Sequence, residues 1–77
     1  MIHINDAMIE MLPEKHNVVN LSCWQKDGSV MHLNGYVCVK VNKTTGTRLM
    51  KNEKNPAILR EVRTNLIFKF NDEEVCI

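Results

Sequence analysis

Basic side chains are concentrated in the middle of this 77-residue chain. Residues 40–63 contain seven lysines and arginines against two glutamates, a net charge of +5, whereas residues 1–39 and 64–77 each carry a net charge of −2. A basic surface can follow the phosphate backbone of a nucleic acid or bind an acidic protein. We expect that contact from Lys43, Arg48, Lys51, Arg60 and Arg63. The alternative is a solvated basic surface without a partner.

Two aromatic residues, Trp24 and Tyr36, occupy strand positions opposite the apolar face. Proteins that bind single-stranded nucleic acids stack bases on exposed aromatic rings beside a basic groove. Tryptophan is also enriched in the cores of protein interfaces, which favours a packing or interface role over stacking. The second functional hypothesis is therefore a homo-oligomeric structural or assembly protein, with Trp24, Tyr36 and Val30 between subunits.

Ser22 and His32 are predicted to face each other across neighbouring strands. Hydrolases use these residue types together with an orienting carboxylate and an oxyanion site. No acidic residue of these strands points in the direction needed to orient the histidine. The sequence also lacks a Gly-x-Ser-x-Gly motif, a glycine-rich phosphate loop and a His-x-x-x-His pair. The three histidines are scattered, and no His-Cys spacing supports zinc. We expect no catalytic residues, no metal and no cofactor.

Three cysteines, an odd number, further limit the chemistry. Cys23 falls on the apolar face and is expected to be buried, whereas Cys38 and Cys76 fall on the other face. Free thiols in a reducing compartment are favoured over a Cys38–Cys76 disulfide. No basic stretch precedes an apolar one at the N-terminus, so a cytoplasmic or intravirion protein is expected. The longest apolar run is far shorter than the roughly 18 residues of a membrane span.

Residues 18–41 predict a long β-hairpin that would position these side chains. Residues 30–41 alternate strictly between two faces, which is the period of a half-buried strand, and Gly35 marks a bend. With a strand at 18–25, a loop of residues 26–28 places Gly28 at the left-handed position and keeps apolar residues on one face. This register has three apolar-face pairs: Cys23 with Met31, Leu21 with Leu33, and Val19 with Gly35.

The N-terminal segment predicts a helix over residues 6–12. Asn5 is the expected cap, Pro13 discourages continuation, and the side chains of Met8, Ile9 and Leu12 share one face. Two helical turns are marginal alone, so the helix is expected to dock on the sheet and plug one of its open ends.

The second half of the chain predicts strands at 47–51, 57–64, 66–70 and 73–77. For residues 57–64 a helical turn is the alternative, because apolar residues fall on both strand faces. Three apolar residues share one side of the strand 66–70: Leu66, Phe68 and Phe70. A type I′ turn at residues 71 and 72 would pair Phe68 with Val75 and Leu66 with Ile77, which places Ile77 in the core.

The expected fold is mainly β, in a single domain spanning residues 1–77. A short N-terminal helix precedes a five- or six-stranded antiparallel meander that curls into a small barrel, since closure removes exposed sheet edges. A chain this short buries only about 60% of its unfolded surface, so a partner subunit would add stability.

The short helix, the long strand bent at a glycine and the run of short strands resemble the Sm-like small-barrel architecture at the level of topology. The chain also resembles small proteins encoded by phages and mobile elements of gut bacteria, in the pattern Val-Asn-Leu…Trp-x-Lys-Asp-Gly and the terminal Phe-Asn-Asp-Glu-Glu-Val. The second resemblance implies no activity and no functional residues. We therefore expect a non-enzymatic interaction module whose basic central segment contacts nucleic acid or an acidic protein, with phage or mobile-element assembly as the alternative.

Overall fold

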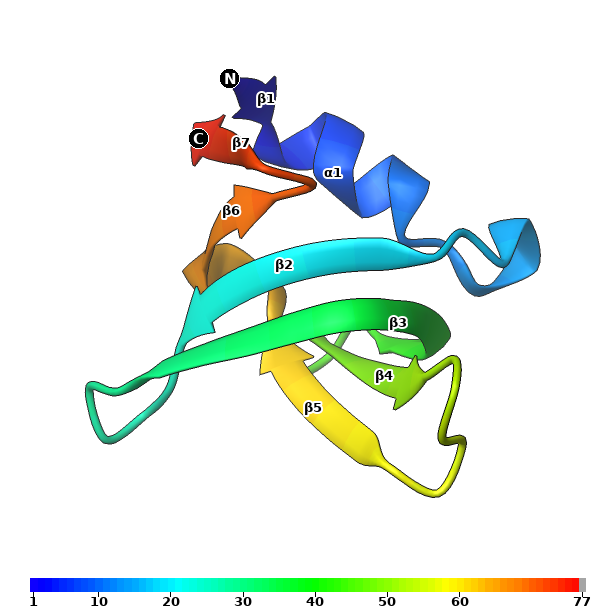
Figure 1. Cartoon of the computed structure of the whole chain (residues 1–77). Helices are drawn as coiled ribbons and strands as arrows, with labels where there is room; N and C mark the ends of the chain where they lie inside the picture. The colour runs from blue at the N-terminus through cyan, green and yellow to red at the C-terminus, as the bar shows by residue number, and fades with distance from the viewer. Residues whose placement is uncertain (77) are drawn as a thin grey trace.

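The computed structural model describes residues 1–76 of the chain (Figure 1). Within these residues the fold is mainly β, with one short α-helix near the N-terminus. In chain order the elements are β1 (Ile2–His3), α1 (Ile4–Glu10), a 3₁₀ turn (Pro13–Lys15), β2 (Val19–Trp24), β3 (Val30–Asn42), β4 (Thr47–Asn52), β5 (Leu59–Arg63), a second 3₁₀ turn (Thr64–Leu66), β6 (Ile67–Phe70) and β7 (Glu73–Cys76).

In the described part of the chain, seven strands form one sheet in the order β1-β7-β6-β2-β3-β4-β5. The meander prediction is correct for β2 to β5 but wrong for β6, which returns to pair with β2. Within residues 1–76 the sheet is not closed into a barrel, which corrects the predicted closure. The second 3₁₀ turn leads the chain away from β5 before β6 begins. The unpredicted β1 pairs in parallel with β7.

The β2–β3 hairpin has the predicted register over most of its length. Leu21 pairs with Leu33 and Cys23 with Met31, and Gly28 has a φ of 87° in the three-residue loop. The Asp27 carboxylate accepts hydrogen bonds from the Ser29 backbone N–H (3.0 Å) and hydroxyl (2.6 Å). The hydroxyl bond is the main reason that the pKa of Asp27 lies below its ordinary value. The loop is therefore fixed by local hydrogen bonds at the end of the hairpin.

Gly35 bends β3 as predicted, but it also reverses the side-chain alternation. Its φ is 73°, and the register shifts so that Val19 pairs with Tyr36 instead of Gly35. An extra residue in one strand turns the following side chains to the other face. Tyr36 and Cys38 consequently point into the core, so their predicted outward placement is wrong.

A second irregularity in β3 lies at Val39, between the Cys38–Met50 and Lys40–Leu49 pairs. The alternation reverses again, and Val41 returns to pack against the core. Figure 1 shows β3 as a long bent strand, which pairs first with β2 and then with β4.

The strand β6 contains a similar irregularity opposite β2. Ser22 pairs with Lys69 but Cys23 pairs with Ile67, which leaves Phe68 as the extra residue. Ile67 and Phe70 are both buried as a result. The predicted common face of Leu66, Phe68 and Phe70 is wrong, since Leu66 belongs to the 3₁₀ turn.

The turn between β6 and β7 has the predicted form. Asn71 and Asp72 have φ values of 48° and 66°, as a type I′ turn requires. Phe70 pairs with Glu73, which is the register predicted for this hairpin. The predicted pairing and burial of Ile77 lie outside the described residues.

The helix α1 begins two residues earlier than predicted. The cap is His3 instead of Asn5, since the His3 Nδ1 atom accepts a hydrogen bond from the backbone N–H of Asn5 (3.1 Å). The residues that dock α1 into the core are Ala7 and Met11, whereas Ile9 is 49% exposed. The predicted face of Met8, Ile9 and Leu12 is therefore not the buried face.

The core joins Ala7 and Met11 to the inner faces of the strands. Its other members are Val19, Leu21, Cys23, Leu33, Tyr36, Cys38, Met50, Val62, Ile67 and Phe70. All three cysteines are free thiols, and burial raises the pKa of Cys23 and of Cys38. Within residues 1–76, no helix has the length and hydrophobicity that a membrane crossing needs.

Candidate nucleic-acid interface

The predicted basic contact residues do not form one surface. Arg48 is only 4% exposed, because it points inward between Val41 of β3 and Val62 of β5. Its Nη1 atom donates to the Thr64 hydroxyl (2.8 Å) and its Nη2 atom to the Met8 carbonyl oxygen (3.3 Å). The prediction that Arg48 is a surface contact is therefore wrong.

Lys43 and Lys51 lie apart from each other. Lys43 is exposed in the β3–β4 loop. Lys51 is half-buried on the outer face of the sheet, between Val37 and Leu59. Neither lysine lines the concave site that contains the remaining two predicted cations.

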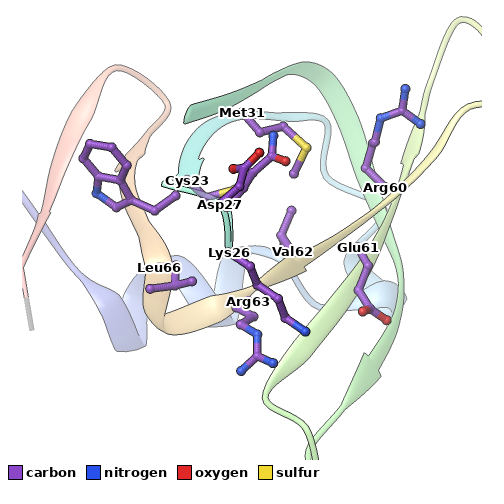
Figure 2. Close-up of a pocket in the computed structure, with 11 residues that line it drawn as sticks. Cys23, Lys26, Asp27, Met31, Arg60, Glu61, Val62, Arg63 and Leu66 are labelled. Carbon is purple, nitrogen blue, oxygen red and sulfur yellow. The ribbon is translucent and has the colours of Figure 1, made fainter. Parts of the chain in front are cut away.

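Arg60 and Arg63 line a cleft of about 510 Å³ between the end of the β2–β3 hairpin and β5, here called the β5 cleft (Figure 2). Figure 2 shows the two guanidinium groups pointing away from each other along β5. Arg60 shares the inner face with Arg48 and Met50, whereas Arg63 lies on the outer face opposite Thr47. Lys26 from the hairpin loop adds a third cation, which was not predicted.

The β5 cleft has an apolar interior, and a half-exposed aromatic residue, Trp24, lies at its border on the face of β2 opposite Cys23. The apolar lining residues are Cys23, Met31, Val62 and Leu66. Trp24 is 48% exposed, and its ring lies 5.2 Å from that of Phe68 at an interplanar angle of 36°. The predicted partner aromatic, Tyr36, is buried elsewhere. Phe68 was missed because the irregularity in β6 has no sequence signal.

The free edge of β5 borders the cleft. The Ile58 carbonyl oxygen and the Thr64 N–H group both form backbone hydrogen bonds on the β4 side of β5. Backbone groups in an antiparallel strand point alternately toward and away from the partner, so those of Leu59, Glu61 and Arg63 face the free edge. The Arg60 Nη1 atom donates to the Leu59 carbonyl oxygen (2.8 Å), which holds the Arg60 charge at this edge.

The charge around the β5 cleft is moderately positive. Lys26, Arg60 and Arg63 outnumber Asp27 and Glu61. Over residues 1–76, the ion pairs join the Met1 amino group to Glu73 (3.4 Å) and Lys15 to Glu10 (4.0 Å), so they involve none of the three cleft cations. Those cations remain available to an anionic ligand.

Ser22 and His32 face each other as predicted, with 2.7 Å between Oγ and Nδ1. They line a hollow of about 300 Å³ that Asp72 also lines. For the residues described, no carboxylate hydrogen-bonds the His32 ring. The contact satisfies the buried Ser22 hydroxyl, and it lacks the orienting acid that a nucleophilic serine requires. No cluster of three metal-ligating side chains occurs in residues 1–76.

No protein-family model matches the chain, and no curated protein or solved structure shows significant similarity to it. The resemblances to Sm-like and phage proteins therefore stay predictions.

The sequence did contain a signal for part of the missed site. Lys26 follows Trp24 by two residues and stands in a correctly predicted loop at the end of the hairpin. A cation in that loop stays at the same end of the hairpin as Trp24, whatever the rest of the fold. The approach of β5 to this loop had no comparable signal, because it depends on the return of β6 to β2.

Proposed function

We propose that the chain is a non-enzymatic module that binds single-stranded nucleic acid in the β5 cleft. The observation that carries the proposal is the half-exposed Trp24 ring beside an apolar cleft with three cations around it. Binders of single strands combine these parts, since bases stack on aromatic rings while basic side chains follow the backbone.

The position of Trp24 suits stacking. The Phe68 ring packs against the indole, with 5.2 Å between the two ring centroids. This contact restricts the indole before binding, so less conformational freedom is lost when a base stacks on it. Stacking on an aromatic side chain contributes on the order of 1–3 kcal/mol per base and tolerates any base. The ring supplies affinity without sequence preference.

The free edge of β5 adds a means of contacting base edges. The backbone groups of Glu61 and Arg63 border the cleft, and they are the donors and acceptors that an unstacked base would meet there. A base paired in a duplex does not expose its Watson–Crick edge to such groups. The arrangement therefore favours single strands over duplexes.

Fluorescence anisotropy of a labelled single-stranded oligonucleotide tests the proposal. Each exposed phosphate contact contributes on the order of 0.5–1 kcal/mol, so replacing both Arg60 and Arg63 by alanine is expected to lower affinity roughly tenfold. The log–log salt slope, about −2 for three phosphates, should shrink by about 1.4.

The matched control replaces Lys54 and Lys69 by alanine, because both are exposed and lie outside the β5 cleft. This pair removes the same charge and should change affinity less than twofold. An equal loss in both double variants would show diffuse attraction instead of a site. No binding of the unmodified protein at low salt would overturn the proposal.

Self-assembly is the second candidate, and the free edge of β5 favours it. An unpaired strand edge can accept a strand from another copy, and Leu59 on β5 is about half exposed. Tyr36, one of the predicted interface residues, is buried within the chain and is therefore not part of this interface. Light scattering separates the candidates, since pairing along β5 doubles the 8.9 kDa mass and occupies the edge that the nucleic acid needs.

A further inference from the structure

A second concave surface lies away from the β5 cleft and shares no lining residue with it. It is a groove of about 920 Å³ between α1 with the following residues 12–14 and the β3–β4 hairpin, here called the helix groove. The walls carry five apolar side chains: Met8, Ile9, Leu12, Val39 and Val41. Ile9 and Val39 are 49% and 43% exposed.

Arg48 lines the same groove. Its two hydrogen-bond partners, Thr64 and Met8, are groove residues as well. The Nε atom of Arg48 is buried and has no hydrogen-bond partner within residues 1–76, and no carboxylate lies within ion-pair distance of this side chain. A buried cation without a counter-charge is costly, and an anion in the groove would offset that cost.

The contacts of Arg48 leave N–H donors unused for such an anion. A guanidinium has five N–H donors, of which two are used here. The bond to the Met8 carbonyl oxygen, at 3.3 Å, is longer than a typical N–H···O bond, so exchanging it for a carboxylate loses little. Lys40 and Lys43 also line the groove against one acid, Glu14, which makes the surroundings positive.

We propose that the helix groove binds a small aliphatic carboxylate, with its carboxylate at the Arg48 guanidinium and its alkyl chain on the apolar walls. An alkyl chain requires only apolar contact from the walls, and the groove supplies that on both the helix and the hairpin side. The proposal is independent of nucleic-acid binding, because the two surfaces have no residue in common.

Decanoate and decyltrimethylammonium, kept below their micelle concentrations, and decanol, kept below its solubility limit, test the proposal by NMR of the methionine methyl groups. Met8 reports on the helix groove and Met31 on the β5 cleft, so each spectrum carries its own control. Decanoate is expected to shift the methyl resonance of Met8 and not that of Met31. Its affinity should be at least tenfold above that of either other probe.

Variants complete the test. Val39→Asp places a negative charge on an exposed groove position and should weaken decanoate binding at least tenfold. Val18→Asp is the matched control, since Val18 is 50% exposed and lies outside the groove, and it should change binding less than twofold. Arg48→Met should remove the preference for the carboxylate if the variant folds.

Three results would overturn the proposal. Equal binding of all three probes would indicate an apolar patch that does not recognise anions. A shift at Met31 without one at Met8 would place the ligand elsewhere. Tighter binding of an acetylated Ala-Leu-Leu tripeptide with a free carboxylate than of decanoate would assign the groove to peptide carboxyl termini.

Discussion

At the scale of single residues, position in the strand determines what a charged side chain does. Arg48 and Arg60 both point to the inner face of the sheet, yet Arg48 is buried and Arg60 is exposed. The difference arises because β4 has a neighbouring strand on both sides, whereas β5 lies at the edge. Charge alone predicted a surface position for both residues. The sequence of β4 does not show which of its two faces points inward, because the consecutive residues Leu49 and Met50 are both apolar.

Gly35 provides a direct test at the residue scale. Gly35→Ala is expected to lower the free energy of unfolding by about 1–2 kcal/mol, since a side chain disfavours the φ of 73°. No heavy atom outside the neighbouring residues lies within 4 Å of the added Cβ, so the loss comes from the backbone conformation and not from a clash. Urea denaturation measures it.

Gly35→Asn is the matched control, because asparagine adopts the left-handed region more readily than alanine. It should lose less stability than Gly35→Ala despite its larger side chain. A larger loss for asparagine would mean that space, and not φ, makes glycine necessary.

At the scale of elements, the sequence predicted turns better than strand faces. The loop at residues 26–28 and the turn at Asn71 and Asp72 follow from local residue preferences, and both are confirmed. The irregularities at Val39 and Phe68 were not predictable, because each depends on the register of a neighbouring strand. The earlier irregularity at Gly35 turns the following side chains over, which explains why Tyr36 and Cys38 were placed on the wrong face.

The helix α1 gives a prediction about its buried face. Met11→Ala should lower the free energy of unfolding by about 2–4 kcal/mol, since Met11 is almost completely buried among core residues. Ile9→Ala is the matched control, and it should cost less than about 0.5 kcal/mol because half of the side chain is exposed. Thermal or urea unfolding measures both. Similar losses for the two variants would contradict the observed docking of α1.

At the scale of the whole molecule, the open sheet explains where the candidate sites lie. Because β6 pairs with β2 and not with β5, a cleft remains beside β5, and the end of β2 with Trp24 and the hairpin loop with Lys26 border it. The helix groove occurs on different elements, where α1 meets the β3–β4 hairpin. The sequence predicted a mainly β chain with a basic middle segment. The pairing of β6 with β2 is a long-range contact, and no local pattern specifies it.

Titration of the intrinsic Trp24 fluorescence with a short oligothymidylate is the sharpest test of the proposed β5 cleft site, because Trp24 is the single tryptophan of the chain. We expect saturable quenching that is reversed as salt is added, since a base stacks on the indole while phosphates meet the cations of the β5 cleft. Unchanged Trp24 emission, while anisotropy of the labelled oligonucleotide shows saturated binding, would contradict the proposed site.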